Sequence, residues 1–230
     1  MISRPLLLAL TSAALLILAF PSFNQAWCAW IALVPWLVAL RGATPRQAFT
    51  RSYLVGLLFF LGSMWWLVHL TAFGGPAAIL GWLVLSAYLA LYFGIFGWLT
   101  HAWLDQRQET RDQRLKRRAK VSCLLSPVSC LIVIPSLWVA LEFLRSRLLS
   151  GFGWNLLGYS QASWLPIIQI AEVTGVWGVS FLIVLVNVAI AFALRAHRLS
   201  PLVVVGACVL AAWGYGVARL KASDAVGPAS

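Results

Sequence analysis

Few side chains in this sequence have the types and spacing that support chemistry. The four cysteines, Cys28, Cys123, Cys130 and Cys208, form no CxxC pair and have no His at metal-ligand spacing. A thiol nucleophile needs a base or cation that lowers its pKa in water-accessible surroundings, whereas these cysteines lie in or beside apolar runs. We therefore expect small buried hydrophobic side chains, with no metal, no cofactor and no complete catalytic apparatus.

Glu142 and Arg145 are the most informative ionisable pair. They end an apolar run at a spacing of three residues, so they share a helix face. Ionisable residues within apolar segments are candidates for function. Two interpretations are open: a local ion pair that anchors the helix end, or a polar post that organises a lipid headgroup site. Glu172 precedes another apolar run. The helix dipole favours an acid in the first turn of a helix, which is a sufficient structural reason for Glu172 at this position.

The composition indicates a bilayer as the solvent. Hydrophobic residues make up 62% of the 230 residues and charged residues 10%, against roughly 45–50% and about 25% in soluble domains. The net charge of +11 would suggest nucleic-acid binding in a soluble protein. Here the basic residues stand in short gaps between apolar runs, as the positive-inside rule predicts, so no nucleic-acid partner is expected.

The apolar runs predict an all-α membrane protein, a bundle of about seven transmembrane helices with an outward-facing interfacial loop over residues 144–172. A spanning helix needs about 20 mostly apolar residues. The predicted spans and the short tail that follows them are 5–20, 26–40, 53–70, 77–103, 121–143, 173–194, 200–218 and 219–230.

The basic residues predict the orientation. With the N-terminus in the cytoplasm, 13 of the 17 Lys and Arg residues lie on the inner side, seven of them within residues 105–120, and four on the outer side. This asymmetry favours seven spans with the N-terminus inside and the C-terminus outside.

The loop over residues 144–172 differs in kind from the spans. Trp154 and Tyr159 are amphipathic aromatics of the sort that settle at headgroup level, and Asn155 and Gln161 offer amide donors and acceptors. An ordinary aromatic interfacial belt is the alternative interpretation. The candidate residues for lipid or domain contact are Glu142, Arg145, Trp154, Asn155, Tyr159 and Gln161.

Several motifs occur in a fixed order along the chain. They read WVALEFLR at 138–145, GFGWNLLGYSQ at 151–161, WLPIIQ at 164–169 and TGVWGVSF at 174–181. Two further stretches, at 18–42 and 56–67, read LAFPSFNQAWCAWIALVPWLVALRG and GLLFFLGSMWWL. Together these motifs resemble bacterial apolipoprotein N-acyltransferase over nearly the whole chain. Gly153 departs from the pattern, because the family usually has Pro at this place.

The resemblance implies an inner-membrane domain followed by a periplasmic nitrilase-like domain with a Glu-Lys-Cys triad. That domain takes an acyl chain from a phospholipid and passes it to the diacylated N-terminal cysteine of a lipoprotein. No residue of this chain matches the triad, and twelve residues after the last span are too few for a domain. We therefore expect a truncated or split enzyme, inactive alone, that acts with a separate nitrilase-like domain.

The alternative is a non-catalytic lipid-binding or scaffolding membrane protein. A transporter is disfavoured, because the chain shows neither paired intramembrane charges nor repeats.

Overall fold

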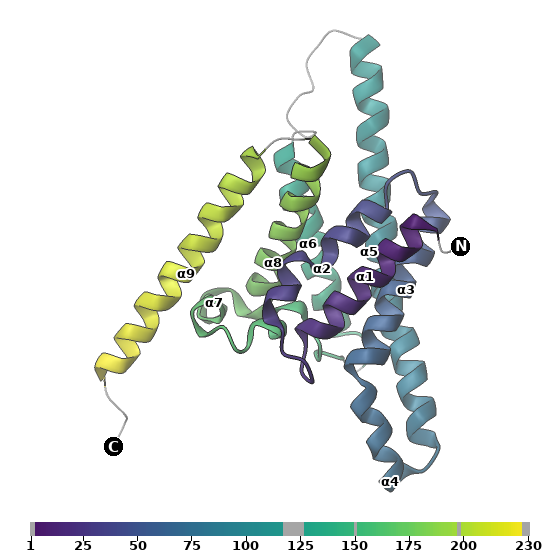
Figure 1. Ribbon diagram of the computed structural model, residues 1–230, viewed down its shortest axis with the longest axis vertical. Helices are drawn as coiled ribbons and strands as arrows, with labels where there is room; N and C mark the ends of the chain where they lie inside the picture. The colour runs from purple at the N-terminus through teal and green to yellow at the C-terminus, as the bar shows by residue number, and fades with distance from the viewer. Residues whose placement is uncertain (1–2, 117–126, 150, 197–198, 227–230) are drawn as a thin grey trace.

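Every regular element in the described part of the chain, residues 3–116, 127–149, 151–196 and 199–226, is a helix. This computed structural model (Figure 1) therefore confirms the all-α prediction. The long helices are α1 (Arg4–Ala19), α2 (Ala29–Ala39), α3 (Pro45–Ser63), α5 (Ala77–Lys116), α6 (Pro127–Arg145), α8 (Ala171–Ala196) and α9 (Ser200–Val226). The short ones are η1 (Ala26–Cys28), η2 (Trp65–Leu70), α4 (Thr71–Gly74), η3 (Leu157–Gln161) and α7 (Leu165–Ile168).

A helix lies at each of the seven places predicted for a span, but not every helix is long enough to cross a bilayer. Three described helices are long and apolar enough, over Ala77–Leu104, Ala171–Arg195 and Ser200–Ser223. The count rises to four if the bent pair Pro45–Ser63 and Trp65–Gly74 forms one span. Seven spans therefore stay a prediction.

Several predicted boundaries differ in the structure, and α3 begins at Pro45 rather than at 53. The third predicted span, 53–70, is not one straight helix, because α3 ends at Ser63 and the chain bends by 52° into η2 and α4. The predicted tail from 219 continues as helix to Val226. The charged segment 105–120 extends α5 as far as Lys116, while its side chains and residues 117–126 lie outside the described part of the chain.

The start of α3 follows from its local sequence. Thr44 accepts a hydrogen bond from the Gln47 backbone N–H at 3.3 Å, and the Gln47 side chain accepts one from the Thr44 N–H at 3.1 Å. This reciprocal capping satisfies two backbone donors that the first helical turn leaves without partners. Pro45 stands at the first helical position, where its missing N–H costs nothing.

Trp36 of α2 lies at the centre of the core. It is fully buried, and its indole N–H donates to the Ser52 hydroxyl at 2.8 Å. Its ring packs against Phe93 and Phe96 of α5, and against Trp138 of α6, at centroid distances of 5.5, 5.3 and 6.1 Å. Through this one side chain, α2 therefore contacts three other helices, α3, α5 and α6.

A buried asparagine of α8 completes the backbone hydrogen bonding of α2. The Asn187 amide accepts from the Leu33 backbone N–H and donates to the Ala29 carbonyl, both at 2.9 Å. Ala29 and Leu33 are four residues apart, which is the spacing of an ordinary helical hydrogen bond. Within an apolar bundle each backbone polar group needs a partner, and Asn187 supplies two of them.

Small residues allow α3 and α5 to pack closely. A Cβ atom placed on Gly56 would stand 2.6 Å from Cβ of Phe93, and one on Gly97 would overlap the Ser52 side chain. Lipid tails are as apolar as the helix surfaces, so the hydrophobic effect does not drive helices together within a membrane. Close packing through small residues does so instead.

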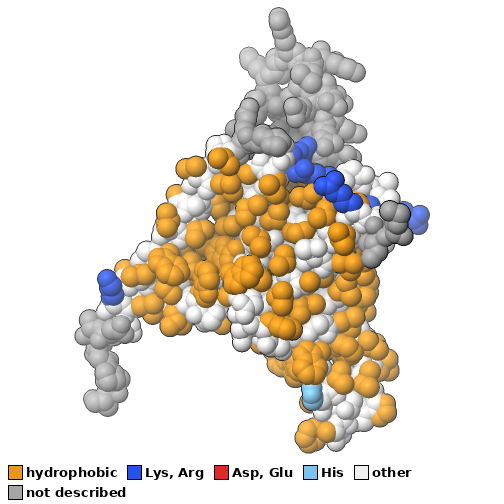
Figure 2. All heavy atoms as spheres, in the orientation of Figure 1, with side chains coloured by type: hydrophobic (Ala, Val, Ile, Leu, Met, Phe, Trp, Pro, Cys, Tyr) orange, Lys and Arg blue, Asp and Glu red, His pale blue; other side chains and the backbone are white. Residues whose placement is uncertain are grey.

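The outer surface is apolar and α9 stands apart from the bundle. In Figure 1 α9 diverges from the other helices toward the C-terminus, and only 11% of its spanning window is buried. Figure 2 shows hydrophobic side chains over most of the visible described surface, with Lys and Arg gathered mainly toward one end. An apolar surface of this extent is what lipid contact requires, so the chain is a membrane protein.

Candidate functional site

Glu142 and Arg145 end α6, and both are buried, with exposed fractions of 5% and 3%. Their side chains form no ion pair with each other: the ion pair found among the described residues joins Arg219 to Glu172. Each instead binds the backbone of the loop that follows. The local ion pair considered from the sequence is therefore not what holds this helix end.

The Glu142 carboxylate holds the loop through one of its oxygens. Oε1 accepts from the Trp138 indole N–H at 2.9 Å and from the Leu157 backbone N–H at 2.7 Å. Oε2 is buried and has no hydrogen-bond partner among the described residues, although the Ser180 hydroxyl lies beside the carboxylate. A buried carboxylate oxygen is costly unless a hydroxyl or a ligand group donates to it, so Oε2 is a candidate contact for a ligand.

The positively charged Arg145 guanidinium binds the same loop. It donates to the carbonyl oxygens of Trp154 at 3.0 Å and Asn155 at 3.2 Å. It also lies 5.3 Å from the centre of the Phe60 ring, within the range of a cation–π contact. The backbone carbonyl of Arg145 accepts from the Phe152 N–H at 2.9 Å. These contacts fold residues 152–155 back onto the end of α6.

Asn155 and Trp154 connect the loop to the α3–η2 bend. Asn155 adopts a left-handed backbone with φ of 54°, which asparagine tolerates better than most residues. Its amide donates to the Ser63 hydroxyl at 2.7 Å. The Trp154 ring stacks on Trp66 at 5.4 Å and is 56% exposed. The loop therefore combines an exposed aromatic contact, between Trp154 and Trp66, with a polar contact between Asn155 and Ser63.

Gln161 and Tyr159 serve other ends of the loop. Gln161 is fully buried, accepts from the Trp30 indole N–H and donates to the Ala26 carbonyl, both at 3.0 Å. It fixes η3 against the start of α2 and has no surface left for a ligand. Tyr159 is 48% exposed. Of the six predicted residues, the structure brings Glu142, Arg145, Trp154 and Asn155 together, and leaves Gln161 in a positioning role.

A pocket of about 310 Å³ opens where α5, α6 and the loop meet. Its lining combines an aromatic wall with the buried acid and base, and consists of Tyr92, Phe93, Phe96, Trp138, Leu141, Glu142, Arg145 and Asn155. Sequence reasoning missed the α5 wall. The sequence feature that could have indicated this wall is the pair Tyr88 and Tyr92, which places two hydroxyls one helical turn apart in an apolar run. Their hydroxyl oxygens lie 2.7 Å from each other.

The pocket suits binding rather than covalent chemistry. No cysteine lines it, and the cysteines with described side chains are Cys28 and Cys130, both buried, and Cys208 on α9. Cys123 lies outside the described residues. Among the described residues no three His, Cys, Asp or Glu side chains gather as metal ligands. An apolar wall with one buried cation and one buried anion can orient an amphipathic molecule.

The end of α9 docks beside this loop. Arg219 Nε donates to Glu172 Oε2 at 2.8 Å, and the Tyr215 hydroxyl donates to the same oxygen at 3.3 Å. A Cβ atom on Gly216 would overlap the Pro166 backbone of α7. Glu172 therefore does more than complement a helix dipole. It ties the C-terminal half of α9 to the end of the bundle that carries the loop.

Comparison with known proteins agrees with the motif order. Residues 12–189 match the family described as apolipoprotein N-acyltransferase N-terminal domain. The apolipoprotein N-acyltransferase of Geobacter metallireducens is 36% identical over 237 residues, covering 98% of this chain and 42% of the relative. That of Azotobacter vinelandii is 33% identical over 218 residues, covering 92% and 39%.

A third relative shows the same partial coverage. The apolipoprotein N-acyltransferase of Pasteurella multocida is 32% identical over 198 residues, covering 84% of this chain and 34% of its own length. The chain thus spans about two fifths of the length of these curated relatives. Because the family match covers well over half of the chain, this protein belongs to the apolipoprotein N-acyltransferase N-terminal domain family, as its motifs predict.

Proposed function

We propose that this chain is the membrane domain for acyl transfer from a phospholipid to the diacylated N-terminal cysteine of a lipoprotein. In this proposal it lies in the bacterial inner membrane, with its N-terminus cytoplasmic and its C-terminus periplasmic. The pocket of Glu142, Arg145 and the α5 aromatic wall receives the phospholipid. A nitrilase-like catalytic domain, carrying the Glu-Lys-Cys triad, docks on the loop over residues 144–172.

One observation carries the proposal: the pocket, the loop and the C-terminal half of α9 lie at the same end of the bundle. Glu142 and Arg145 hold the loop, and Glu172 at the start of α8 holds Arg219 of α9. A domain that follows α9 would therefore stand at the same end of the bundle as the pocket. The greater length of the relatives supports the presence of such a domain in the complete enzyme.

The lipid is recognised in two parts. The apolar wall of Tyr92, Phe93 and Phe96 suits an acyl chain, because burial of each methylene contributes roughly 0.8 kcal/mol. Exposed Trp154 and Trp66, stacked on each other, suit the headgroup level, where indole rings settle. The loop would then hold the glycerol ester within reach of the docked nucleophile.

A chimera tests the proposal. The region of the Geobacter metallireducens relative that this chain does not cover is fused after Ser230, and N-acylation of a diacylated lipopeptide is followed by mass spectrometry. We expect acyl transfer by the chimera and none by the chain alone. The intact Geobacter protein is the positive control. A chimera that is monodisperse and inactive beside an active control contradicts the proposal.

A matched pair of variants tests the loop within the same chimera. Asn155→Gly removes the amide that reaches Ser63 while keeping a residue that accepts the positive φ. Asn24→Gly makes the same exchange at another left-handed asparagine, far from the loop in sequence. We expect at least about a tenfold loss of acyl transfer for Asn155→Gly, as displaced positioning groups cause, and wild-type activity for Asn24→Gly.

Equal activity of the two variants would show that the loop is an ordinary aromatic interfacial belt without a role in acyl transfer. The non-catalytic alternative makes a different prediction: the chain binds phospholipid, and the chimera transfers no acyl group at any level of lipid occupancy.

A further inference from the structure

A second pocket lies at the opposite end of the bundle. It opens between α2, α5, α6 and α8 and has a volume of about 360 Å³, which includes space open to solvent. It is lined by Leu37, Arg41, Leu104, Ile134, Val188, Ala191, Phe192 and Arg195. Leu104 follows Tyr92 by twelve residues on α5, which is about 18 Å along the helix axis. Their nearest lining residues are Phe96 and Leu104 on α5 and Trp138 and Ile134 on α6, about 12 and about 6 Å apart along the helix axes. The two pockets therefore lie at different depths of the same bundle.

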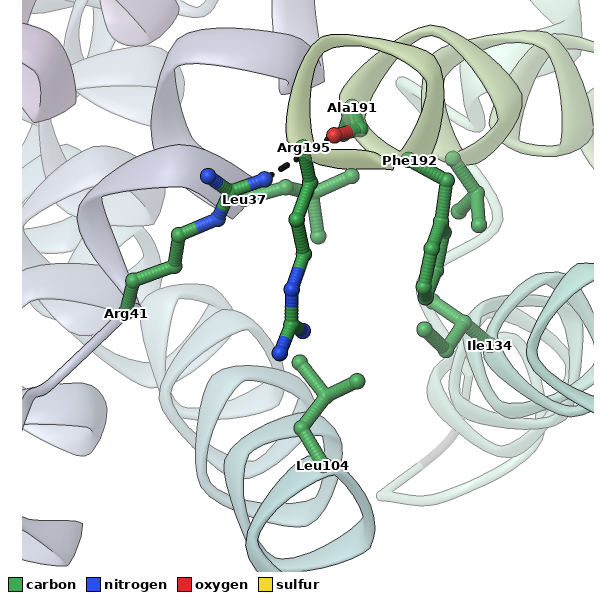
Figure 3. Close-up of a pocket in the computed structure, with 8 residues that line it drawn as sticks. Leu37, Arg41, Leu104, Ile134, Ala191, Phe192 and Arg195 are labelled. Atoms are coloured by element: carbon green, nitrogen blue, oxygen red, sulfur yellow. Dashed lines mark hydrogen bonds between the residues drawn. The ribbon is translucent and has the colours of Figure 1, made fainter. Parts of the chain in front are cut away.

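Two arginines distant in sequence meet at this pocket. Arg41 follows α2 and donates to the Ala191 carbonyl of α8 at 3.0 Å. Figure 3 shows the Arg195 side chain extending from the last turn of α8 beside Arg41, with its guanidinium directed toward Leu104. Within the described part of the chain, Arg195 has no hydrogen-bond or ion-pair partner.

The two positive charges act on each other. Burial lowers the pKa of the Arg41 guanidinium from its ordinary value, and the nearby charge of Arg195 lowers it further. A guanidinium keeps its positive charge in proteins. The carboxylates with described side chains, Glu142 and Glu172, lie at the other end of the bundle. An anion between Arg41 and Arg195 would relieve their repulsion.

The rest of the pocket is apolar. Apart from the two arginines, its lining residues are all apolar, among them Leu37, Ile134 and Val188, so the pocket combines two cationic side chains with a hydrocarbon lining. A free anion would leave the apolar part of the pocket unused. A phospholipid fits both parts, since basic pockets between transmembrane helices bind anionic headgroups and an acyl chain fills an apolar slot.

We propose that Arg41 and Arg195 bind the phosphate of an anionic phospholipid whose acyl chain enters the apolar pocket between α5, α6 and α8. With the proposed orientation, this lipid belongs to the cytoplasmic leaflet, across the membrane from the candidate site. It holds the ends of α2, α5 and α8 together. The lipid bound here is a resident one and is not consumed.

Lipid binding to the full chain tests this site without requiring acyl transfer. The purified protein in detergent is titrated with dioleoyl-phosphatidylglycerol, and bound lipid is counted by native mass spectrometry. Arg195→Gln should weaken binding about fivefold, as expected for one lost arginine at a lipid headgroup. Arg46→Gln is the matched control, because Arg46 is exposed near the same helix ends and does not line the pocket; its affinity should change less than twofold.

Two further arms separate the lipid from a bare anion. Ala191→Leu narrows the apolar part and keeps both charges, so it should also weaken phosphatidylglycerol binding. Inorganic phosphate at millimolar concentration should not displace the lipid. Displacement by phosphate would make this an anion site only. Equal losses for Arg195→Gln and Arg46→Gln would show general surface attraction, and unchanged binding in Arg195→Gln and Ala191→Leu would overturn the proposal.

Discussion

Glu142 accepts a hydrogen bond at 2.7 Å from the backbone N–H of Leu157, fifteen residues further along the chain. The bond joins the last turn of α6 to the first residue of η3. Because the same oxygen also receives the Trp138 indole N–H, the carboxylate fixes the loop relative to the pocket wall. This buried acid is therefore one of the groups that position the loop, together with Arg145, Asn155 and Gln161.

Removal of this acid should destabilise the protein. Hydrogen bonds to a charged group contribute about 1.5–3 kcal/mol each, so Glu142→Ala should lower the free energy of unfolding by at least about 2 kcal/mol. Glu142→Gln keeps a carbonyl oxygen and should lose less. The measurement is an SDS unfolding titration followed by tryptophan fluorescence. Glu172→Gln, at a half-exposed carboxylate, is the control, and an Ala variant as stable as this control would contradict the prediction.

Asn187 should be a second determinant of stability. Asn187→Ala removes the amide that serves Ala29 and Leu33 and leaves a small cavity. We expect a loss of about 2 kcal/mol, from unmade buried hydrogen bonds and lost packing. Ser86→Ala is the matched control, because the buried Ser86 hydroxyl has no hydrogen-bond partner within the described residues, and it should be nearly neutral. Similar melting temperatures for both variants would show that α2 closes its own hydrogen bonds.

The contact between Arg219 and Glu172 should act locally rather than on global stability. Both side chains are about half exposed, and such pairs contribute about 1 kcal/mol at most. Arg219→Gln should nevertheless release the end of α9 from α7. Spin labels at positions 163 and 222 should report a broader distance distribution in this variant than in wild type. Lys221→Gln removes a charge from the same helix end and should leave the distribution unchanged; broadening in both variants would point to general electrostatics.

The orientation can be tested by cysteine labelling in a variant without native cysteines. Thirteen of the 17 basic residues fall on the predicted inner side, so a cysteine at Gln108 should resist a membrane-impermeant reagent added from outside. A cysteine at Ser163, in the loop, should react. The opposite pattern would invert the proposed topology and move the loop to the cytoplasm.

The sequence by itself determined where the helices lie, because hydropathy and helix capping are local properties. The charge-free run from 52 to 104 and its break at Gly74–Gly75 predict the start of α5 at Ala77. The start of α3 at Pro45 was missed, although the Thr44–Gln47 capping pair is a local signal for it. Motif order also determined the family. The bend after Ser63 was not predictable, since residues 53–70 are mostly apolar and contain no Asp, Glu, Lys or Arg, and hydropathy does not distinguish a straight helix from a broken one.

Only the tertiary structure decided what the polar residues do. Glu142 and Arg145 are neighbours on one helix face, yet their partners are backbone groups of a loop that the fold returns to them. Arg41 and Arg195 meet across 154 positions of sequence because α2 and α8 end side by side. Spacing along a helix predicts which side chains share a face. It does not predict which distant segment packs there, because that choice depends on how the apolar faces of all the helices are buried together.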